Sequence, residues 1–172
     1  GSEMCIRDRH IGDMGAPATL DSFEDGVGRF TTMYSVDPTA VVADRHPGYV
    51  TRRWAKAQEQ LTFSDAQHHH AHIASVMAEH DLDPGGEVVG FAFDGTGYGD
   101  DGSMWGGEVL VADATTARRV AHLKPVLLPG GDVVVEQPCR AALAHLRAAG
   151  VEWDQELAPV ACFDSSELAL LW

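Results

Sequence analysis

The feature that most constrains the fold is a short, almost entirely apolar run, Val88 to Phe93, which ends at Asp94. The run is too short for a typical helix and lacks the polar alternation of a half-exposed strand. It therefore predicts a central strand covered on both faces. Such strands are typical of α/β proteins, in which helices pack over the sheet.

Helices and further strands flank this run. Apolar residues at three- and four-residue steps, with Pro and Gly near the ends, predict helices over 19–34, 49–60, 66–81, 138–149 and 165–172. Short apolar runs predict strands over 41–43, which we expect to be buried, 105–112 and 118–123. We expect Thr19 to cap the first helix and Ser64 or Asp65 to cap the third. This order predicts a layered α/β structure with a mixed sheet, truncated at both ends because it begins with one helix and stops inside another.

Residues 1–9 show no apolar periodicity and no link to the helix predicted after them. We interpret them as a non-native lead sequence and assign residues 10–172 to one fragment of a domain.

Composition excludes several classes of partner. The chain has 26 acidic and 12 basic side chains and a formal net charge of −14. Nucleic acids and anionic membrane surfaces reward basic patches, so neither is expected to be the main partner. No long apolar run or signal peptide is visible, which predicts a cytoplasmic protein. The three cysteines stand far apart, which predicts neither a disulfide framework nor a thiolate zinc site.

A cluster of histidines is the strongest chemical signal. His68 and His72 are four positions apart on a predicted helix, so they share one face at a spacing where both imidazoles can reach one cation. The alternative is a solvated polar turn. His69 and His70 cannot both point the same way as this pair, so we expect them to hydrogen-bond nearby or to face water.

Asp94 is the best third ligand. It follows the apolar strand and opens a loop with glycines at 95, 97 and 99, and α/β sheets hold ligands at the carboxyl ends of their strands. Gly95, Thr96 and Gly97 are candidates for binding a cofactor through backbone N–H groups. The alternative is a loop that needs glycine for left-handed dihedrals. Two histidines and an aspartate suit iron, zinc or manganese.

Two other residues have open roles. His46, between Arg45 and Pro47, is either a substrate contact or a polar residue at a strand end. Cys139 lies on the apolar side of a predicted helix and is expected to be core, because nothing basic is placed to activate it as a nucleophile.

Several motifs together resemble one family. QHHHAHIASVMAEH, VVGFAFDGTGYGDDGSMWGGEVLVAD, AHLKPVLLPGGD and EQPCRAALA are similar in order and spacing to the HypF carbamoyltransferases of NiFe-hydrogenase maturation, as are HIGDM and ADRHPGY. The resemblance runs from about residue 10 to 150. It implies part of the TsaD-like domain, one lobe of the actin/Hsp70/sugar-kinase (ribonuclease H-like) fold.

The resemblance also implies a function. HypF proteins make carbamoyl adenylate from carbamoyl phosphate and ATP, and the TsaD-like domain transfers the carbamoyl group to the C-terminal cysteine of HypE. The family's metal ligands fall on His68, His72 and Asp94, with iron or zinc expected, and His46 matches a histidine that would contact the carbamoyl group. This part of a lobe is expected to be inactive alone.

Two alternatives stay open. One is an O-carbamoyltransferase of the antibiotic or nodulation-factor type, which shares the fold. The other is a non-catalytic metal-binding fragment. The tRNA-modifying relatives would call for a basic surface, which the net charge of −14 argues against.

Overall fold

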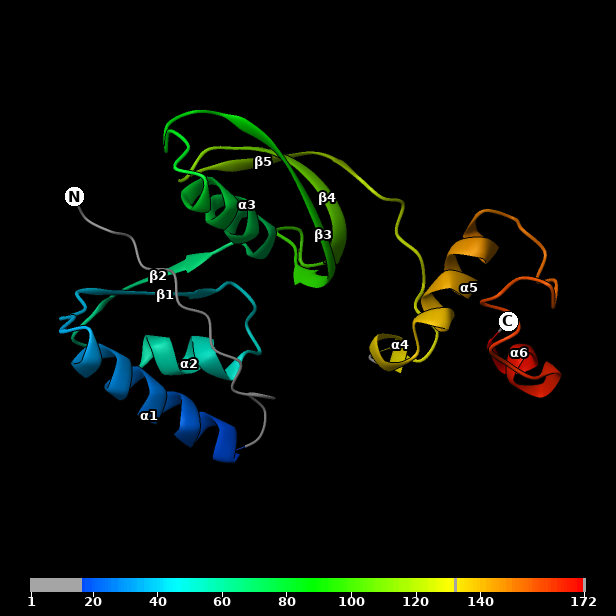
Figure 1. Cartoon of the computed structure of the whole chain (residues 1–172), viewed down its shortest axis with the longest axis horizontal. Coiled ribbons are helices and arrows are strands. Elements are labelled where there is room, and N and C mark those ends of the chain that lie inside the picture. Colours follow the sequence, from blue (N-terminus) through cyan, green and yellow to red (C-terminus); the bar gives the residue numbers. More distant parts are fainter. Residues whose placement is uncertain (1–16, 132, 172) are drawn as a thin grey trace. The chain divides into compact units, whose positions relative to one another are not determined.

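The protein is described by a computed structural model that covers residues 17–131 and 133–171 (Figure 1). The proposed lead sequence 1–9 and the HIGDM motif lie outside the described residues. The chain divides into two compact units, Gly1–Ala121 and His122–Trp172. The helices and strands in chain order are α1 (Pro17–Met33), β1 (Ala40–Asp44), α2 (Val50–Lys56), β2 (Thr62–Ala66), α3 (His68–Glu79), β3 (Val88–Tyr98), β4 (Met104–Ala112), β5 (Ala117–His122), α4 (Val133–Glu136), α5 (Pro138–Ala148) and α6 (Ser165–Leu171).

The α/β fold class is confirmed, and the described strands combine parallel and antiparallel pairing in two sheets. β1 and β2 form a parallel pair, and β3, β4 and β5 form a second sheet in that order, in which β3 and β4 are antiparallel. β2 was not expected: residues 62–66 pair with 40–44 instead of starting a helix. The proposed caps Ser64 and Asp65 are therefore wrong, because both lie within this strand.

The first helix also begins earlier than predicted. α1 includes Pro17, so Thr19 lies inside the helix and is not its cap. Proline suits the first turn of a helix because the N–H it lacks would have no partner there. Phe23 of α1 meets Trp54 of α2 edge to face, with ring centroids 4.9 Å apart, which fixes where this helix packs within the first unit.

The core of the first unit lies between α3 and the antiparallel sheet. It comprises Ile73, Met77, Trp105, Leu110 and Ala112. Burying a side chain such as Ile73 or Leu110 stabilises the unit by about 1.5–3 kcal/mol. The approach is close, because a Cβ on Gly90 would lie 2.3 Å from Cδ1 of Ile73. Glycine at position 90 therefore lets α3 pack directly on β3.

The other face of β3 is not covered in the described structure. Val89, Phe91 and Phe93 are 62%, 64% and 73% exposed, so the expectation of a strand covered on both faces is wrong for these residues. β1 also differs from the prediction, because Val42 is 62% exposed. α3 packs on one side of β3, and side chains alternate between the two faces of a strand.

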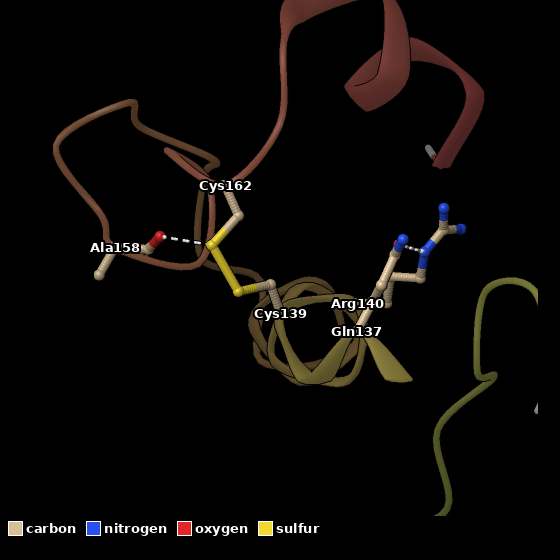
Figure 2. The surroundings of a disulfide bond; sticks show 5 residues. All are labelled: Gln137, Cys139, Arg140, Ala158 and Cys162. Atoms are coloured by element: carbon tan, nitrogen blue, oxygen red, sulfur yellow. Dashed lines mark hydrogen bonds between the residues drawn. A yellow bond between two sulfur atoms is a disulfide. The ribbon is translucent and has the colours of Figure 1, made fainter. Parts of the chain in front are cut away.

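The second unit is built on α5. Pro138 begins this helix as predicted, and Gly150, with φ of +70°, follows its end. Leu143 is fully buried in this unit. Figure 2 shows Cys139 of α5 joined to Cys162 by a disulfide, with Cα atoms 6.7 Å apart.

That disulfide corrects the interpretation of the cysteines. Cys139 was expected to be core, and no disulfide was predicted. The two cysteines are 23 residues apart in sequence, and only the return of the segment after Gly150 toward α5 brings them together. Cys5, the third cysteine, lies outside the described residues.

Candidate metal centre

Two histidines of α3 and one aspartate of β3 converge. Nε2 of His68 lies 2.6 Å from Oδ2 of Asp94, and Nε2 of His72 lies 3.6 Å from the same oxygen. The two histidine Nε2 atoms are 3.2 Å apart. The structure thus brings together the three residues that the spacing and the resemblance had singled out.

The first turn of α3 places the histidine pair. Gln67 caps this helix, its side-chain oxygen accepting a hydrogen bond of 2.8 Å from the backbone N–H of His70. Residues four apart on a helix lie on one face, and the rings of His68 and His72 meet edge to face with centroids 4.8 Å apart. The cap fixes where the helix starts and therefore which face His68 and His72 share.

An irregularity in β3 places Asp94. The strand was expected to end at Asp94 but continues to Tyr98, and its pairing with β4 shifts between Phe93 and Gly97. A bulge of this kind bends a strand and re-aims its side chains. The backbones are close here, because a Cβ on Gly106 would lie 2.9 Å from the carbonyl oxygen of Asp94. Asp94 is therefore held on a sheet rather than on a free loop.

The donor set fits a metal ion. The potential ligand atoms of His68, His72 and Asp94 all lie within 4.8 Å of one another. Two imidazole nitrogens and a carboxylate oxygen at such distances repel one another unless a cation or a proton lies among them. Imidazole and carboxylate are common ligands of zinc and iron.

A second carboxylate supports His68. Oδ2 of Asp44, at the end of β1, lies 2.5 Å from Nδ1 of His68. The other oxygen, Oδ1, accepts a hydrogen bond of 2.7 Å from the backbone N–H of His46. Asp44 was not singled out from the sequence, although it directly follows the predicted strand 41–43, a position at which α/β sheets hold ligands.

A cavity of about 210 Å³ contains His46. Its lining residues are His46, Tyr49, Gly97, Tyr98, Gly102, Ser103 and Met104. The ring of His46 stacks on Tyr49, with centroids 4.2 Å apart, and meets Tyr98 edge to face at 5.1 Å. Nδ1 of His46 accepts a hydrogen bond from the N–H of Gly48, so in the neutral ring Nε2 carries the proton. His46 is therefore a potential hydrogen-bond donor in the cavity wall.

Burial and two nearby carboxylates change the pKa of Tyr49, the tyrosine that stacks on His46. Burial, together with the negative charges of Asp44 and Asp94, raises the pKa of Tyr49. A raised pKa keeps the phenol protonated and able to donate a hydrogen bond. Tyr49 and Tyr98 were not singled out from the sequence, because an isolated tyrosine carries no spacing signal.

The remaining histidines of the cluster are not in the group. His69 is fully buried, its Nδ1 lies 3.4 Å from the amide nitrogen of Gln67, and burial lowers its pKa. Nε2 of His70 lies 2.8 Å from the carbonyl oxygen of Asp113, so this ring ties α3 to the end of β4. His69 and His70 thus pack and hydrogen-bond around the pair.

The residues predicted to bind a cofactor, Gly95, Thr96 and Gly97, lie in different surroundings. Gly95 is exposed, and a Cβ there would meet nothing within 4 Å. Gly97 is buried beside His69 and also lines the cavity. The backbone of Thr96 continues β3 between them. Gly95, Gly97 and Gly99 do not have a positive φ, so the alternative that glycine is needed at these positions for left-handed dihedrals is wrong.

Comparisons with known proteins place the chain in a family. Residues 2–79 match the profile "HypF Kae1-like domain", and residues 90–171 match "Carbamoyltransferase, Kae1-like Domain, second subdomain". The first match includes residues 2–9; the boundary proposed at residue 10 stays a prediction. An α/β chain with this histidine and aspartate group thus carries residues of a Kae1-like domain.

Relatives with known names agree. The chain is 42% identical over 138 residues to "Carbamoyltransferase HypF" of Synechocystis sp., covering 80% of this chain and 18% of that protein. It is 41% identical over 145 residues to "Carbamoyltransferase HypF2" of Cupriavidus necator, covering 83% and 18%. The chain belongs to the HypF family and spans about a fifth of the length of these relatives.

Solved structures show the same likeness. A full-length HypF crystallised in a phosphate- and nucleotide-bound form is 40% identical, with a TM-score of 0.76, covering 94% of this chain and 21% of that one. The HypF of T. kodakarensis is 40% identical, with a TM-score of 0.67, covering 81% and 18%. The expected resemblance and the fold class are thereby confirmed.

Among the described residues, no helix has both the length and the apolar character needed to cross a membrane.

Proposed function

We propose that this chain is the carbamoyl-transfer part of a HypF-type carbamoyltransferase. The observation that carries the proposal is the convergence of His68, His72 and Asp94, linked through Asp44 to His46 in the wall of the neighbouring cavity. Family membership supports the reaction class, because the matched relatives are named carbamoyltransferases. No observation favours the O-carbamoyltransferase alternative over this one.

His68, His72 and Asp94 would hold the metal, iron or zinc, through two nitrogens and an oxygen. When bound, such an ion supplies Lewis acidity that polarises a carbonyl group. The chain's own residues then have separate tasks: the Nε2–H of His46 donates to the carbamoyl group, and Tyr49 and Tyr98 enclose the ring of His46.

The proposed step is a transfer from carbamoyl adenylate to a thiol. The sulfur of the C-terminal cysteine of a HypE-like protein attacks the carbamoyl carbon and forms a C–S bond. The bond between that carbon and the phosphate oxygen breaks, its electron pair leaves with AMP, and the thiol proton passes to solvent. His46 would orient the carbamoyl group for this attack.

ATP and carbamoyl phosphate are the proposed sources of the adenylate in the full-length protein. We place the nucleotide near Gly95, Thr96 and Gly97, because Gly95 leaves its backbone open and Gly97 lines the cavity. The phosphate- and nucleotide-bound form of the related full-length HypF supports a nucleotide as ligand of the family. The net charge of −14 favours a protein acceptor over nucleic acid or a membrane surface.

Metal analysis tests the site. We expect the wild-type chain, loaded with zinc or with iron under anaerobic conditions and then desalted, to retain about one ion per chain. His68→Ala, His72→Ala and Asp94→Ala should each lose most of it, because each removes one of three ligands. His80→Ala is the matched control, since this exposed histidine caps the end of the same helix. Unchanged metal content in all three ligand variants would contradict the site.

A chimera tests the reaction. In Synechocystis HypF, the segment that matches this chain is replaced by the corresponding residues of this chain. Transfer of a labelled carbamoyl group to HypE is then measured. We expect the chimera to be active and its His46→Ala variant to lose activity by about 10²-fold or more. A chimera that retains metal but transfers nothing would favour the non-catalytic alternative.

A further inference from the structure

The carboxylate of Asp44 contacts both halves of the candidate site. Oδ2 lies 2.5 Å from Nδ1 of His68, the nitrogen that faces away from Asp94. Oδ1 accepts the backbone N–H of His46 at 2.7 Å. Both oxygens of one side chain are thus engaged, one with a proposed metal ligand and one with the segment that carries His46.

The contact with His68 selects one form of the ring. A carboxylate accepts hydrogen bonds, so Asp44 favours the form of His68 with a proton on Nδ1. That form leaves the lone pair of Nε2 for the cluster with His72 and Asp94. Metal-ligating histidines commonly donate their second nitrogen to a carboxylate in this way, which fixes both tautomer and orientation.

The contact with His46 fixes the cavity wall. Asp44 is the last residue of β1, and its side chain bonds the backbone two residues on, which is the turn that Asp favours at such ends. The turn sets the direction of the chain before Pro47 and therefore the position of the His46 ring against Tyr49.

We propose that Asp44 is a positioning residue that orients His68 for the metal and, through the same carboxylate, holds His46 at the cavity. The inference rests on the proposed metal site. It adds a residue that neither spacing nor the resemblance had indicated.

Asp44→Asn separates the two tasks. The asparagine oxygen still accepts the N–H of His46, but its amide group would face Nδ1 of His68 and donate to it, placing the ring proton on Nε2. We expect the affinity for Co²⁺, measured by titration of the whole chain, to fall about 10- to 100-fold. The exchange rate of the His46 amide should stay near that of the wild type.

Asp44→Ala removes both contacts. We expect the same loss of Co²⁺ affinity and, in addition, faster exchange of the His46 amide. Asp65→Asn is the matched control: it lies on the adjacent strand β2 and bonds Arg45 and Arg52, not the histidines. Its Co²⁺ affinity should stay within about twofold of the wild type, although its ion pairs are lost.

The outcomes separate this inference from the metal site itself. Wild-type protein that binds no Co²⁺ overturns both. If the wild type binds Co²⁺ and both Asp44 variants bind it as tightly as the wild type does, only the role of Asp44 is overturned. A measurement that needs no variant is the Nδ1 proton of His68 in the zinc-loaded wild type. We expect a downfield NMR signal in slow exchange, and a His68 ring without that proton would overturn the inference.

Discussion

Gly97 lies directly against the ring of His69. A Cβ at position 97 would stand 2.3 Å from Cε1 of His69 and 3.0 Å from Cδ2 of His68. His69 is fully buried and its ring lies beside Trp105, so moving it away from a new Cβ would disturb buried neighbours. The absence of a side chain at Gly97 therefore lets β3 approach the histidines of α3.

Gly97→Ala should accordingly damage the site through packing. We expect it to lower the free energy of unfolding by about 1–3 kcal/mol, the usual cost of an overpacked core, and to weaken metal binding by displacing His68. Denaturant unfolding and Co²⁺ titration measure the two effects. Gly95→Ala is the control two residues away, because a Cβ there meets nothing within 4 Å. Equal behaviour of the two variants would refute this role of Gly97.

Asp113 should titrate well below an ordinary aspartate. Hydrogen bonds from the backbone N–H groups of Thr115 and Thr116 lower its pKa from 3.8 to about 2. Because the folded-state pKa is lowered, the carboxylate stabilises the turn above pH 4 and loses this effect as the pH falls from about 4 to about 2. NMR titration of the Asp113 carboxyl carbon measures the midpoint, and a value near 3.8 would contradict the turn geometry.

Reduction of the disulfide should loosen the second unit. Cys139 and Cys162 close a loop of 23 residues in sequence separation, for which the chain-entropy estimate is about 3 kcal/mol. We expect dithiothreitol to speed hydrogen exchange of α5 amides without changing those of α3. Cys139→Ser should show the fast exchange with or without reductant. Alkylation followed by mass spectrometry checks that the reagent acts on this pair.

The chain alone should not complete the transfer. It spans 18% of the Synechocystis relative, and the resemblance implies that it holds only part of the lobe proposed to carry out the transfer. Incubation of this chain with carbamoyl adenylate and HypE is therefore expected to give no labelled HypE above a blank. Appreciable transfer would show that this chain suffices for the reaction.

The local pattern of the sequence was enough for the histidine pair but not for its surroundings. His68 and His72 could be placed because helical spacing is a local property, and Asp94 because it follows an apolar strand. Asp44 lies 24 residues from His68 in sequence, and only the pairing of β1 with β2 brings it near. Such contacts depend on sheet register, which no short motif encodes.

The difference between local pattern and long-range contact also explains the errors in the predicted fold. Residues 64–66 were expected to begin a helix, and the strand over 62–66 was not expected, because a five-residue strand with one large apolar side chain has a weak pattern. Val88 to Phe93 was correctly placed in a strand, but its burial depends on what packs there. α3 covers the face of Ala92, whereas Phe91 and Phe93 remain exposed.

The three proposed metal ligands fall on both sides of the junction between the two matched family regions. His68 and His72 belong to the first, 2–79, and Asp94 to the second, 90–171, yet all three lie within one compact unit that ends at Ala121. A chimera of two homologues joined at the junction between those regions would therefore take His68 and His72 from one protein and Asp94 from the other. A crossover after Ala121 would keep these three residues together, so the unit of exchange for the proposed site is longer than the first matched region, 2–79.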